Sequence, residues 1–401
     1  MRVLLSAFQC APGLGSEPGT GWHWATTLPR LGHEVTVLTS STQRELIRSA
    51  GPQSAEFRFV DDPWALPEHG VPPLVRSYDF YRRWQDAALR QIAANAQQYD
   101  VAHHVTWASL HLGSQLWRLP VPLIYGPIGG GQTAPPGYGR YFGRGWGAET
   151  LRTAATGSLL KLNKRSRETL RHSAVTLVCN SATEAAVKRL GARDVRFMLA
   201  DGLASENLSE PRPRPPGLPV VFWVGRMLPR KSPVLAVEAF AHLRRAMPAR
   251  LVMAGDGPLR GQVRAAIDRL GLAADVDLLG HVSLAELRQL YDSASVLLFS
   301  SLRESFGAPF LEALGRGLPT VALDLHGIAD ADVGDAAVKV PLPPDPRDLA
   351  GHIGAGLQTI LSDGIWESRS VAAVKWASSW VWESKAATAT QIYQEVAGAR
   401  G

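Results

Sequence analysis

The chain has 401 residues, a formal net charge of +6 at pH 7, 45% hydrophobic residues and 19% charged residues. At about 150 residues per domain this length predicts two or three domains, and the balanced composition excludes a peptide hormone, a disulfide mini-scaffold and a largely disordered chain. Cys10 and Cys179 are the two cysteines, too few for a disulfide framework or a four-thiolate zinc site, so we expect a cytoplasmic protein.

The chain opens on a short apolar run at residues 3–6, which is too short for the core of a secretory signal and is followed by no small-residue cleavage site. It therefore predicts a buried first strand. Further apolar runs, separated by longer amphipathic segments, predict strands at residues 34–38, 57–60, 101–104, 123–125, 176–178 and 195–198. This alternation is typical of β-α units around a parallel sheet. No run approaches the roughly 18 apolar residues of a membrane-spanning helix.

Basic residues are concentrated in the first half of the chain. Residues 1–205 contain 22 lysines and arginines against 15 acidic residues, whereas the remainder contains 20 against 21. Five basic residues share one helical stretch, namely Lys161, Lys164, Arg165, Arg167 and Arg171. The excess indicates an anionic partner, such as a phosphorylated acceptor or a membrane surface, although a solvated helix face gives the same pattern. No recognised nucleic-acid-binding module accompanies it, so we expect no nucleic-acid partner.

A proline-rich stretch at residues 206–219 cannot continue a helix or complete a strand ladder, and we interpret it as a linker. After it the pattern restarts, with strands predicted at residues 220–224, 251–254, 276–279, 296–299 and 320–323. The sequence therefore predicts two doubly wound domains, residues 1–205 and 220–381, with a ligand site at the carboxyl ends of the strands, in the cleft between them. Residues 382–398 predict a terminal helix that we expect to pack on the first domain.

The turns after the strands of the second domain carry candidate binding residues. Gly225 and Arg226 follow the first of these strands, and Lys231 lies five residues beyond the arginine. Close backbone approach at a glycine together with two cations suits a diphosphate, and two solvated cations are the alternative. The next strand leads into a glycine-rich turn at residues 254–258, which is typical of a plain tight turn and less so of direct ligand contact.

The strongest pattern is a pair of carboxylates, Glu304 and Glu312, in the segment after the predicted strand at residues 296–299. Pro309 suits the first turn of a helix, so Glu304 lies in the loop and Glu312 about two turns along the helix. Three amides are expected to be free at the helix N-terminus and to meet hydroxyl or phosphate oxygens. These amides belong to Phe306, Gly307 and Ala308. Two surface glutamates would show the same spacing.

In this order and spacing, the motifs resemble the retaining glycosyltransferases of family 4, which have the α/β GT-B fold of two Rossmann-like domains. In the second half, the resemblance is carried by Gly225-Arg226 with Lys231, Gly255-Asp256-Gly257-Pro258, Gly280-His281-Val282 and the segment from Glu304 to Glu312. In the first half, it is carried by residues 32–39, the strand end at residues 100–104, Asn180-Ser181 and Asp201-Gly202. The match covers nearly the whole chain.

The resemblance implies roles for the residues of the second half. Arg226 and Lys231 would neutralise the departing diphosphate in place of a metal, so neither a metal nor a cofactor is expected beside the nucleotide sugar. Glu304 would hold the donor sugar, together with the loop amides, and Glu312 would hold the ribose hydroxyls. The other donor-binding positions are Gly225 and Gly255, with Gly280, His281 and Val282 lining the base through backbone groups.

In the first half, the resemblance implies a glycine loop at Gly15 and Ser16 near the diphosphate, with Glu17 on the acceptor side. Ser16 stands where many family members have a second glycine, and Ser232 likewise follows Lys231 in place of the usual glycine. A further loop with Gly129 and Gly130 is expected at the acceptor mouth, with a structural turn as the alternative.

One of His103 and His104 is expected to be the cleft histidine of the family, which assists the donor sugar or the acceptor. The H-x-H spacing of the family is not reproduced here, so the resemblance does not select between the two. A structural histidine that is hydrogen-bonded near a strand end is the alternative for each.

The resemblance therefore implies a retaining, metal-independent glycosyltransferase of the hexosyltransferase class, which moves a sugar from a nucleotide diphosphate sugar to an acceptor hydroxyl. The abundance of alanine, arginine, glycine and proline indicates a bacterial source. A cell-envelope glycan, a lipid and a specialised metabolite are the candidate acceptors. Peripheral contact with the anionic inner membrane face is expected through the basic first half. The alternatives are a sugar-nucleotide epimerase or a phosphorylase on the same fold, and a non-catalytic protein that binds sugar nucleotides.

Overall fold

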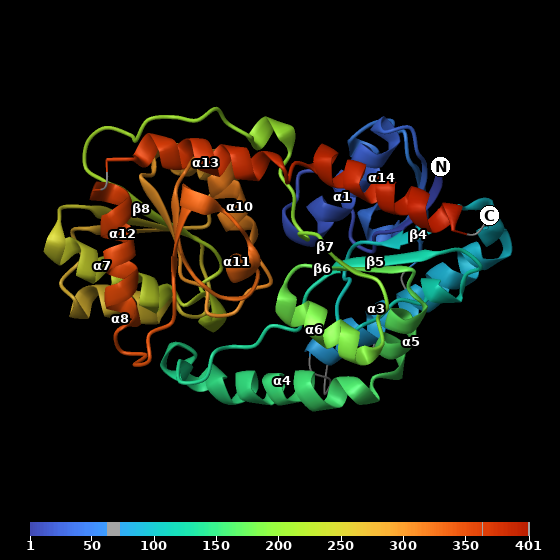
Figure 1. The fold of residues 1–401 in the computed structure, drawn as a ribbon, viewed down its shortest axis with the longest axis horizontal. Helices are drawn as coiled ribbons and strands as arrows, with labels where there is room; N and C mark the ends of the chain where they lie inside the picture. The colour runs from blue at the N-terminus through green and yellow to red at the C-terminus, as the bar shows by residue number, and fades with distance from the viewer. Residues whose placement is uncertain (62–72, 363, 400–401) are drawn as a thin grey trace. The chain divides into compact units, whose positions relative to one another are not determined.

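A computed structural model describes residues 1–61, 73–362 and 364–399, and the chain divides into two compact units. The first unit comprises Met1–Gly131, Ala155–Gly202 and Trp382–Gly401, and the second comprises Gln132–Ala154 and Leu203–Val381. Each unit contains one parallel sheet with helices packed against it (Figure 1). The prediction of two Rossmann-like α/β domains is confirmed.

The sheet of the first unit has the strand order β3-β2-β1-β4-β5-β6-β7. Its strands are β1 (Arg2–Ser6), β2 (Glu34–Ser40), β3 (Glu56–Val60), β4 (Val101–His104), β5 (Leu123–Ile128), β6 (Val175–Val178) and β7 (Val195–Phe197). Its helices are α1 (Ser16–Arg30), α2 (Arg44–Ser49), α3 (Pro73–Ile92), α5 (Lys164–His172), α6 (Ser181–Leu190) and α14 (Trp382–Gly398). The boundary between Ala154 and Ala155 falls inside α4 (Trp146–Ser158).

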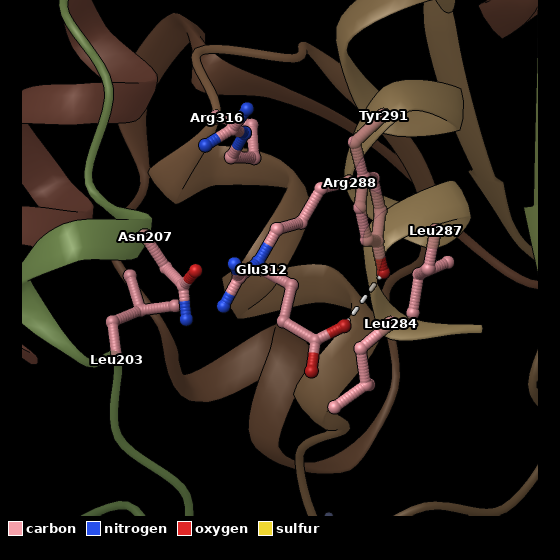
Figure 2. Close-up of a pocket in the computed structure, with 8 residues that line it drawn as sticks. All are labelled: Leu203, Asn207, Leu284, Leu287, Arg288, Tyr291, Glu312 and Arg316. Atoms are coloured by element: carbon pink, nitrogen blue, oxygen red, sulfur yellow. Dashed lines mark hydrogen bonds between the residues drawn. The ribbon is translucent and has the colours of Figure 1, made fainter. Parts of the chain in front are cut away.

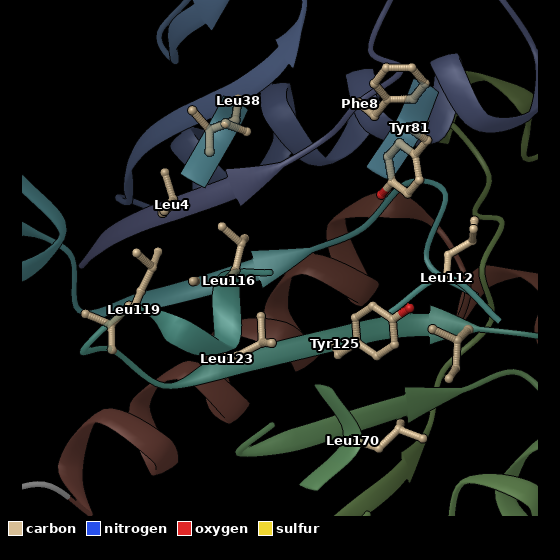
Figure 3. Packing of buried hydrophobic residues seen from close by; sticks show 14 of the residues in the cluster. Leu4, Phe8, Leu38, Tyr81, Leu112, Leu116, Leu119, Leu123, Tyr125 and Leu170 are labelled. Atoms are coloured by element: carbon tan, nitrogen blue, oxygen red, sulfur yellow. The ribbon is translucent and has the colours of Figure 1, made fainter. Parts of the chain in front are cut away.

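Successive residues of β1 enter two different hydrophobic cores, because side chains alternate between the faces of a strand. Leu4 belongs to the core that includes residues of α3, α5 and α6 (Figure 3). Val3 and Leu5 belong to the opposite core, which includes residues of α1 and α14. The terminal helix contributes Trp382, Ala386, Ala389, Ile392 and Tyr393 to that core. The last helix of the chain is therefore an integral part of the first unit.

The sheet of the second unit has the strand order β10-β9-β8-β11-β12-β13. Its strands are β8 (Val220–Val224), β9 (Arg250–Ala254), β10 (Val276–Gly280), β11 (Val296–Phe299), β12 (Thr320–Leu323) and β13 (Ala337–Val340). Its helices are α7 (Pro233–Ala246), α8 (Arg260–Arg269), α9 (Leu284–Ser293), α10 (Ala308–Gly315), α11 (His326–Asp330), α12 (Leu349–Ser362) and α13 (Trp366–Ser378).

Each strand predicted from the sequence coincides with a strand of the structure, but the sequence analysis missed β13. This strand lies at the edge of the second sheet and pairs with β12 alone. It has four residues and includes Lys339, whose ammonium donates to the carbonyl of Ala329 at 3.2 Å. Such a short edge strand with a lysine carries little hydrophobic signal.

The segment Gln132–Ala154 was expected in the first domain, but it belongs to the second unit. Its contacts explain this placement. Tyr138 donates a hydrogen bond to the carbonyl of Pro343 at 3.0 Å, and Arg140 donates to the carboxylate of Glu238 at 2.5 Å. We call residues 132–154 the docked segment.

The proline-rich stretch at residues 206–219 also differs from the prediction, because it lies within the second unit. The guanidinium of Arg212 donates to the carbonyl of Arg316 at 3.2 Å and to that of Tyr291 at 3.0 Å. Prolines indicate the absence of a helix but do not prevent a segment from packing.

Candidate active site

The candidate site lies at the edge of the second sheet that is formed by the carboxyl ends of its strands. β8 and β11 are parallel neighbours, so the segments that follow them meet at the same edge. The first segment leads to a 3-10 turn at Pro229–Lys231, and the second leads to α10. The N–H of Leu302 donates to the carbonyl of Arg230 at 2.9 Å and joins the two segments. This pairing brings together Lys231 and Glu304, two residues that the sequence analysis selected.

Glu304 is the centre of an ion cluster. Its carboxylate accepts a hydrogen bond from Arg230 at 2.7 Å and forms an ion pair with Lys231. The side chain of Glu304 is 19% exposed and that of Lys231 is 12% exposed. Burial alone would raise the pKa of Glu304, but Lys231 and Arg230 outweigh burial and lower this pKa below its ordinary value. The cluster therefore holds an ionised carboxylate beside two cations.

Arg226 was expected to meet the diphosphate together with Lys231, whereas Arg230 was not predicted from the sequence. Arg226 is exposed, and its side chain makes no hydrogen bond or ion pair with any residue that the structure describes. Arg230 directly precedes Lys231 in the same turn and reaches the same carboxylate. Its position directly before Lys231 is the sequence feature from which it could have been predicted.

Gly307 shapes the turn between Glu304 and α10. Its φ is +115°, and a Cβ at this position would lie 2.4 Å from Cζ of Phe299. A residue with a side chain would therefore displace the end of β11. Within the described residues, no acceptor pairs with the backbone N–H groups of Phe306, Gly307 and Ala308. These donors lie at the N-terminus of an eight-residue helix, where the backbone favours negative charge.

Glu312 lines a pocket of about 120 Å³ between α9, α10 and the segment that follows Leu203 (Figure 2). The hydroxyl of Tyr291 donates to its carboxylate at 2.8 Å. Burial raises the pKa of Tyr291 well above its ordinary value, so the hydroxyl remains a donor. Leu284 and Leu287 form an apolar wall of the same pocket. The pocket thus combines a hydrogen-bonded carboxylate and an apolar wall with the polar side chains of Asn207, Arg288 and Arg316.

The glycines at the ends of β8, β9 and β10 pack the turns against one another. A Cβ at Gly255 would lie 2.1 Å from the carbonyl oxygen of Gly225, and the N–H of Gly255 donates to the carbonyl of Gly280 at 2.7 Å. The amide of Gly255 is therefore engaged within the protein. His281 and Val282 line a separate open pocket of about 490 Å³ and do not line the pocket of Glu312.

In the first unit, Gly15 precedes α1 and Ser16 is the first residue of that helix. Glu17, in the first turn, accepts a hydrogen bond from the N–H of Trp107 at 2.8 Å. Burial raises the pKa of Glu17 to about 7, against the lowering effect of the Trp107 hydrogen bond. The glycine turn therefore lies beside a carboxyl group that titrates near neutral pH.

Gly129 and Gly130 follow β5 and pack closely against the chain after β4. The carbonyl of Gly129 accepts a hydrogen bond from the N–H of Leu110 at 3.2 Å. Gly130 has a φ of +116°, and a Cβ there would lie 3.2 Å from that of Leu110 and 3.5 Å from the ring of His111. Glycine is therefore required for this close packing.

For His103 and His104, the structure shows the hydrogen bonding of a structural histidine, which is the alternative to the expected ligand-assisting role. Both rings are fully buried in the first unit, and each of the four ring nitrogens has a hydrogen-bond partner between 2.6 and 2.9 Å away. Burial lowers the pKa of His103 to about 4 and that of His104 to about 3, so both are neutral. The partners are Tyr393, Gly126, Tyr81 and Ser114. Neither histidine presents a nitrogen to a ligand.

Within residues 1–61, 73–362 and 364–399, no three or more histidine, cysteine, aspartate or glutamate residues lie together as a group that could hold a metal ion. No helix there is long and apolar enough to cross a membrane.

Comparison with known families gives two matches in tandem. Residues 22–199 match the model of Glycosyltransferase Family 4, and residues 204–363 match the model of Glycosyl transferases group 1. Together they account for most of both units.

Individual glycosyltransferases and related synthases are similar to this chain in sequence or in structure. D-inositol 3-phosphate glycosyltransferase of Streptomyces bingchenggensis is 27% identical over 325 residues, which cover 74% of this chain and 67% of the relative. Sucrose-phosphate synthase of Thermosynechococcus elongatus has a similar structure, with a TM-score of 0.70, 18% identity and 99% coverage of both chains. HepE of Anabaena, solved in complex with UDP, has a TM-score of 0.61 at 17% identity and covers 97% of this chain and 99% of its own.

Proposed function

The chain belongs to the group 1 glycosyltransferases, with a family 4 N-terminal half, and on this basis we propose that it transfers a sugar from a nucleotide diphosphate sugar to an acceptor hydroxyl, with retention and without a metal. The observation that carries the proposal is the ion cluster of Glu304, Lys231 and Arg230 beside the N-terminus of α10, whose amides have no acceptor among the described residues. The UDP complex of HepE supports a nucleotide donor.

In the proposed complex, the second unit binds the donor. Glu312 accepts hydrogen bonds from the ribose hydroxyls while Tyr291 holds its carboxylate, and the apolar wall of the pocket covers the nucleoside. Lys231 and the exposed Arg226 meet the diphosphate. Glu304 is ionised and accepts a hydrogen bond from a hydroxyl of the donor sugar.

Transfer breaks the bond between the anomeric carbon and the β-phosphate oxygen, and the diphosphate keeps the electron pair. Lys231 and the backbone amides of Gly307 and Ala308 stabilise this developing charge. The acceptor oxygen forms the new bond to the anomeric carbon, and its proton passes to an oxygen of the departing diphosphate. Because cations and amides fixed in the protein neutralise the leaving group, the proposed reaction needs no metal.

The proposal predicts that a nucleoside diphosphate stabilises the folded protein. At a ligand concentration of 100 times Kd, the gain is about 2.7 kcal/mol, and it appears as a rise in Tm. The measurement is a thermal-shift panel of UDP, GDP and ADP and their glucose conjugates, with the free nucleosides as controls and Glu312→Ala as the matched variant. Absence of a shift with every diphosphate would contradict the proposal. Conversion of the sugar nucleotide without an acceptor would favour the epimerase alternative.

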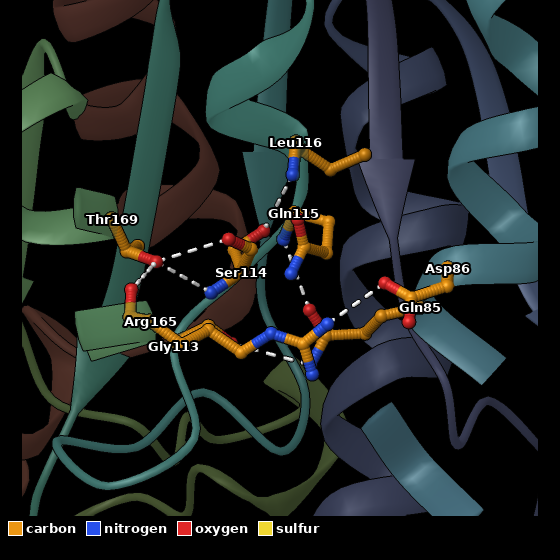
Figure 4. Close-up of polar contacts among 8 residues, drawn as sticks. All are labelled: Gln85, Asp86, Gly113, Ser114, Gln115, Leu116, Arg165 and Thr169. Carbon is orange, nitrogen blue, oxygen red and sulfur yellow. Dashed lines mark hydrogen bonds and ion pairs between the residues drawn. The ribbon is translucent and has the colours of Figure 1, made fainter. Parts of the chain in front are cut away.

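The acceptor side of the proposal includes contact with an anionic membrane. Arg165 does not take part in the proposed membrane surface, because its guanidinium pairs with Asp86 at 2.7 Å inside a polar network (Figure 4). Lys161, Lys164 and Arg171 remain exposed. Leu162 lies among them with 78% of its surface exposed. Exposed cations beside an exposed leucine fit the headgroup region of an anionic bilayer.

We expect the triple variant K161E/K164E/R171E to lose sedimentation with phosphatidylglycerol vesicles and to keep its thermal shift with nucleoside diphosphate. Each lost cation removes about 1 kcal/mol of attraction to an anionic surface. The matched control R189E/R193E/R264E makes the same charge change at other exposed positions. Equal sedimentation of the two triple variants would rule out a localised membrane surface.

A further inference from the structure

The residues on either side of Glu304 are both held by the docked segment. Arg303 forms an ion pair with Glu149 at 2.7 Å, and the side-chain amide of Gln132 donates to the hydroxyl of Ser305 at 2.9 Å. Both Glu149 and Gln132 come from the N-terminal half of the sequence, more than 150 positions before the loop that they contact. The loop of the candidate site is therefore completed by residues distant in the chain.

The ion pair is well shielded from water. The side chain of Glu149 is 8% exposed and that of Arg303 is 17% exposed, and Arg152 lies 3.5 Å from the same carboxylate. Removing one member of such a pair leaves the other charge poorly compensated. The pair therefore fixes the position of Arg303 more strongly than an exposed pair would.

The docked segment also reaches the other half of the ion cluster. A Cβ at Gly145 would lie 3.7 Å from the ring of Pro229, which begins the turn that carries Arg230 and Lys231. The backbone of Arg303 donates to the carbonyl of Arg230 at 3.3 Å. One segment thus packs on the turn of the cations and on the loop of the carboxylate.

We infer that Glu149 and Gln132 are positioning residues, which hold the loop Arg303–Phe306 so that Glu304 meets the sugar of the donor. This inference rests on the proposed function. Neither residue contacts the donor itself, and each acts through a neighbour of Glu304. Loosening this loop should weaken recognition of the sugar and leave recognition of the nucleotide intact, because Glu312 and Tyr291 lie outside the docked segment.

The test compares Glu149→Gln and Gln132→Ala with Arg140→Ala in the full chain. Arg140→Ala removes another ion pair of the docked segment, with Glu238 on α7, away from the loop. Hydrogen exchange should rise about tenfold at residues 302–308 in the first two variants and remain unchanged in the control. The affinity for UDP-glucose should fall about tenfold, while the affinity for UDP changes less than twofold.

Unchanged exchange at residues 302–308 in both variants would overturn the inference, and so would an equal loss of UDP and UDP-glucose affinity. Gln132→Ala keeps the test decisive if Glu149→Gln folds poorly. If the unaltered protein binds neither UDP nor UDP-glucose, the proposed function with a uridine donor fails. The exchange measurement then decides the inference by itself.

Discussion

Replacing Lys231 with alanine should reduce donor turnover by about 10² to 10³-fold while the protein remains folded. Lys231 is a shielded cation at the sheet edge, and its loss removes a preorganised charge from the departing diphosphate. Glu304 keeps Arg230 as an ion partner, so no carboxylate is left unpaired and the fold is preserved. The measurement is release of nucleoside diphosphate from the nucleotide sugar selected by the thermal-shift panel.

Two matched variants separate the roles of this lysine. Lys231→Arg keeps the charge and should retain more turnover than the alanine variant. Arg230→Ala removes the other partner of Glu304, and its effect should be smaller, because Lys231 remains for the diphosphate. Equal losses in Arg230→Ala and Lys231→Ala would mean that the lysine acts through Glu304 alone and does not meet the diphosphate.

Replacing Lys385 with alanine should destabilise the protein by about 3 to 5 kcal/mol. Lys385 lies in α14 with 2% of its surface exposed, and its ammonium donates to three consecutive carbonyls. These are the carbonyls of Leu199, Ala200 and Asp201. The ammonium also lies 4.2 Å from the ring centroid of Trp382. The alanine variant leaves the carbonyls unsatisfied and creates a cavity, which urea denaturation measures as a lower free energy of unfolding.

Lys385→Met is the control that keeps the volume of the side chain, and it allows a test by pH. Burial lowers the pKa of Lys385 from 10.5 to about 7. Between these two values the unfolded chain binds more protons than the folded protein, so the contribution of Lys385 to the unfolding free energy rises with pH. The difference between the unaltered protein and Lys385→Met should therefore grow between about pH 7 and pH 10. A difference that is independent of pH would contradict the lowered pKa.

The sequence predicted the parts of the fold and site that depend on local patterns. The apolar runs located the strands, and the carboxyl ends of neighbouring parallel strands necessarily meet at one edge. That rule brings the loops of Lys231 and Glu304 to the same edge, whereas their ion pair was not predicted from the sequence. Glu312 was selected by its spacing, but its partner Tyr291 was missed because α9 packs beside α10 through tertiary structure.

The sequence could not predict features that depend on packing by segments far away in the chain. His103 resembles a strand-end ligand residue, yet Tyr393, 290 positions later, occupies one of its nitrogens. Burial of a strand end is decided by the helix that covers it, and local pattern contains no information on that helix. The same reason applies to the docked segment, since Glu149 and Arg303 lie far apart in the sequence and meet only in the tertiary structure.

The polypeptide passes between the two units four times, after Gly131, Ala154, Gly202 and Val381. A cut at the proline-rich stretch would therefore yield two fragments, and each would lack a segment that belongs to its own unit. The N-terminal fragment would expose the apolar face that α14 covers, and the C-terminal fragment would lose the support of the Glu304 loop. A chimera intended to exchange donor specificity between relatives should accordingly transplant residues 132–154 together with residues 203–381, and leave α14 with its own first unit.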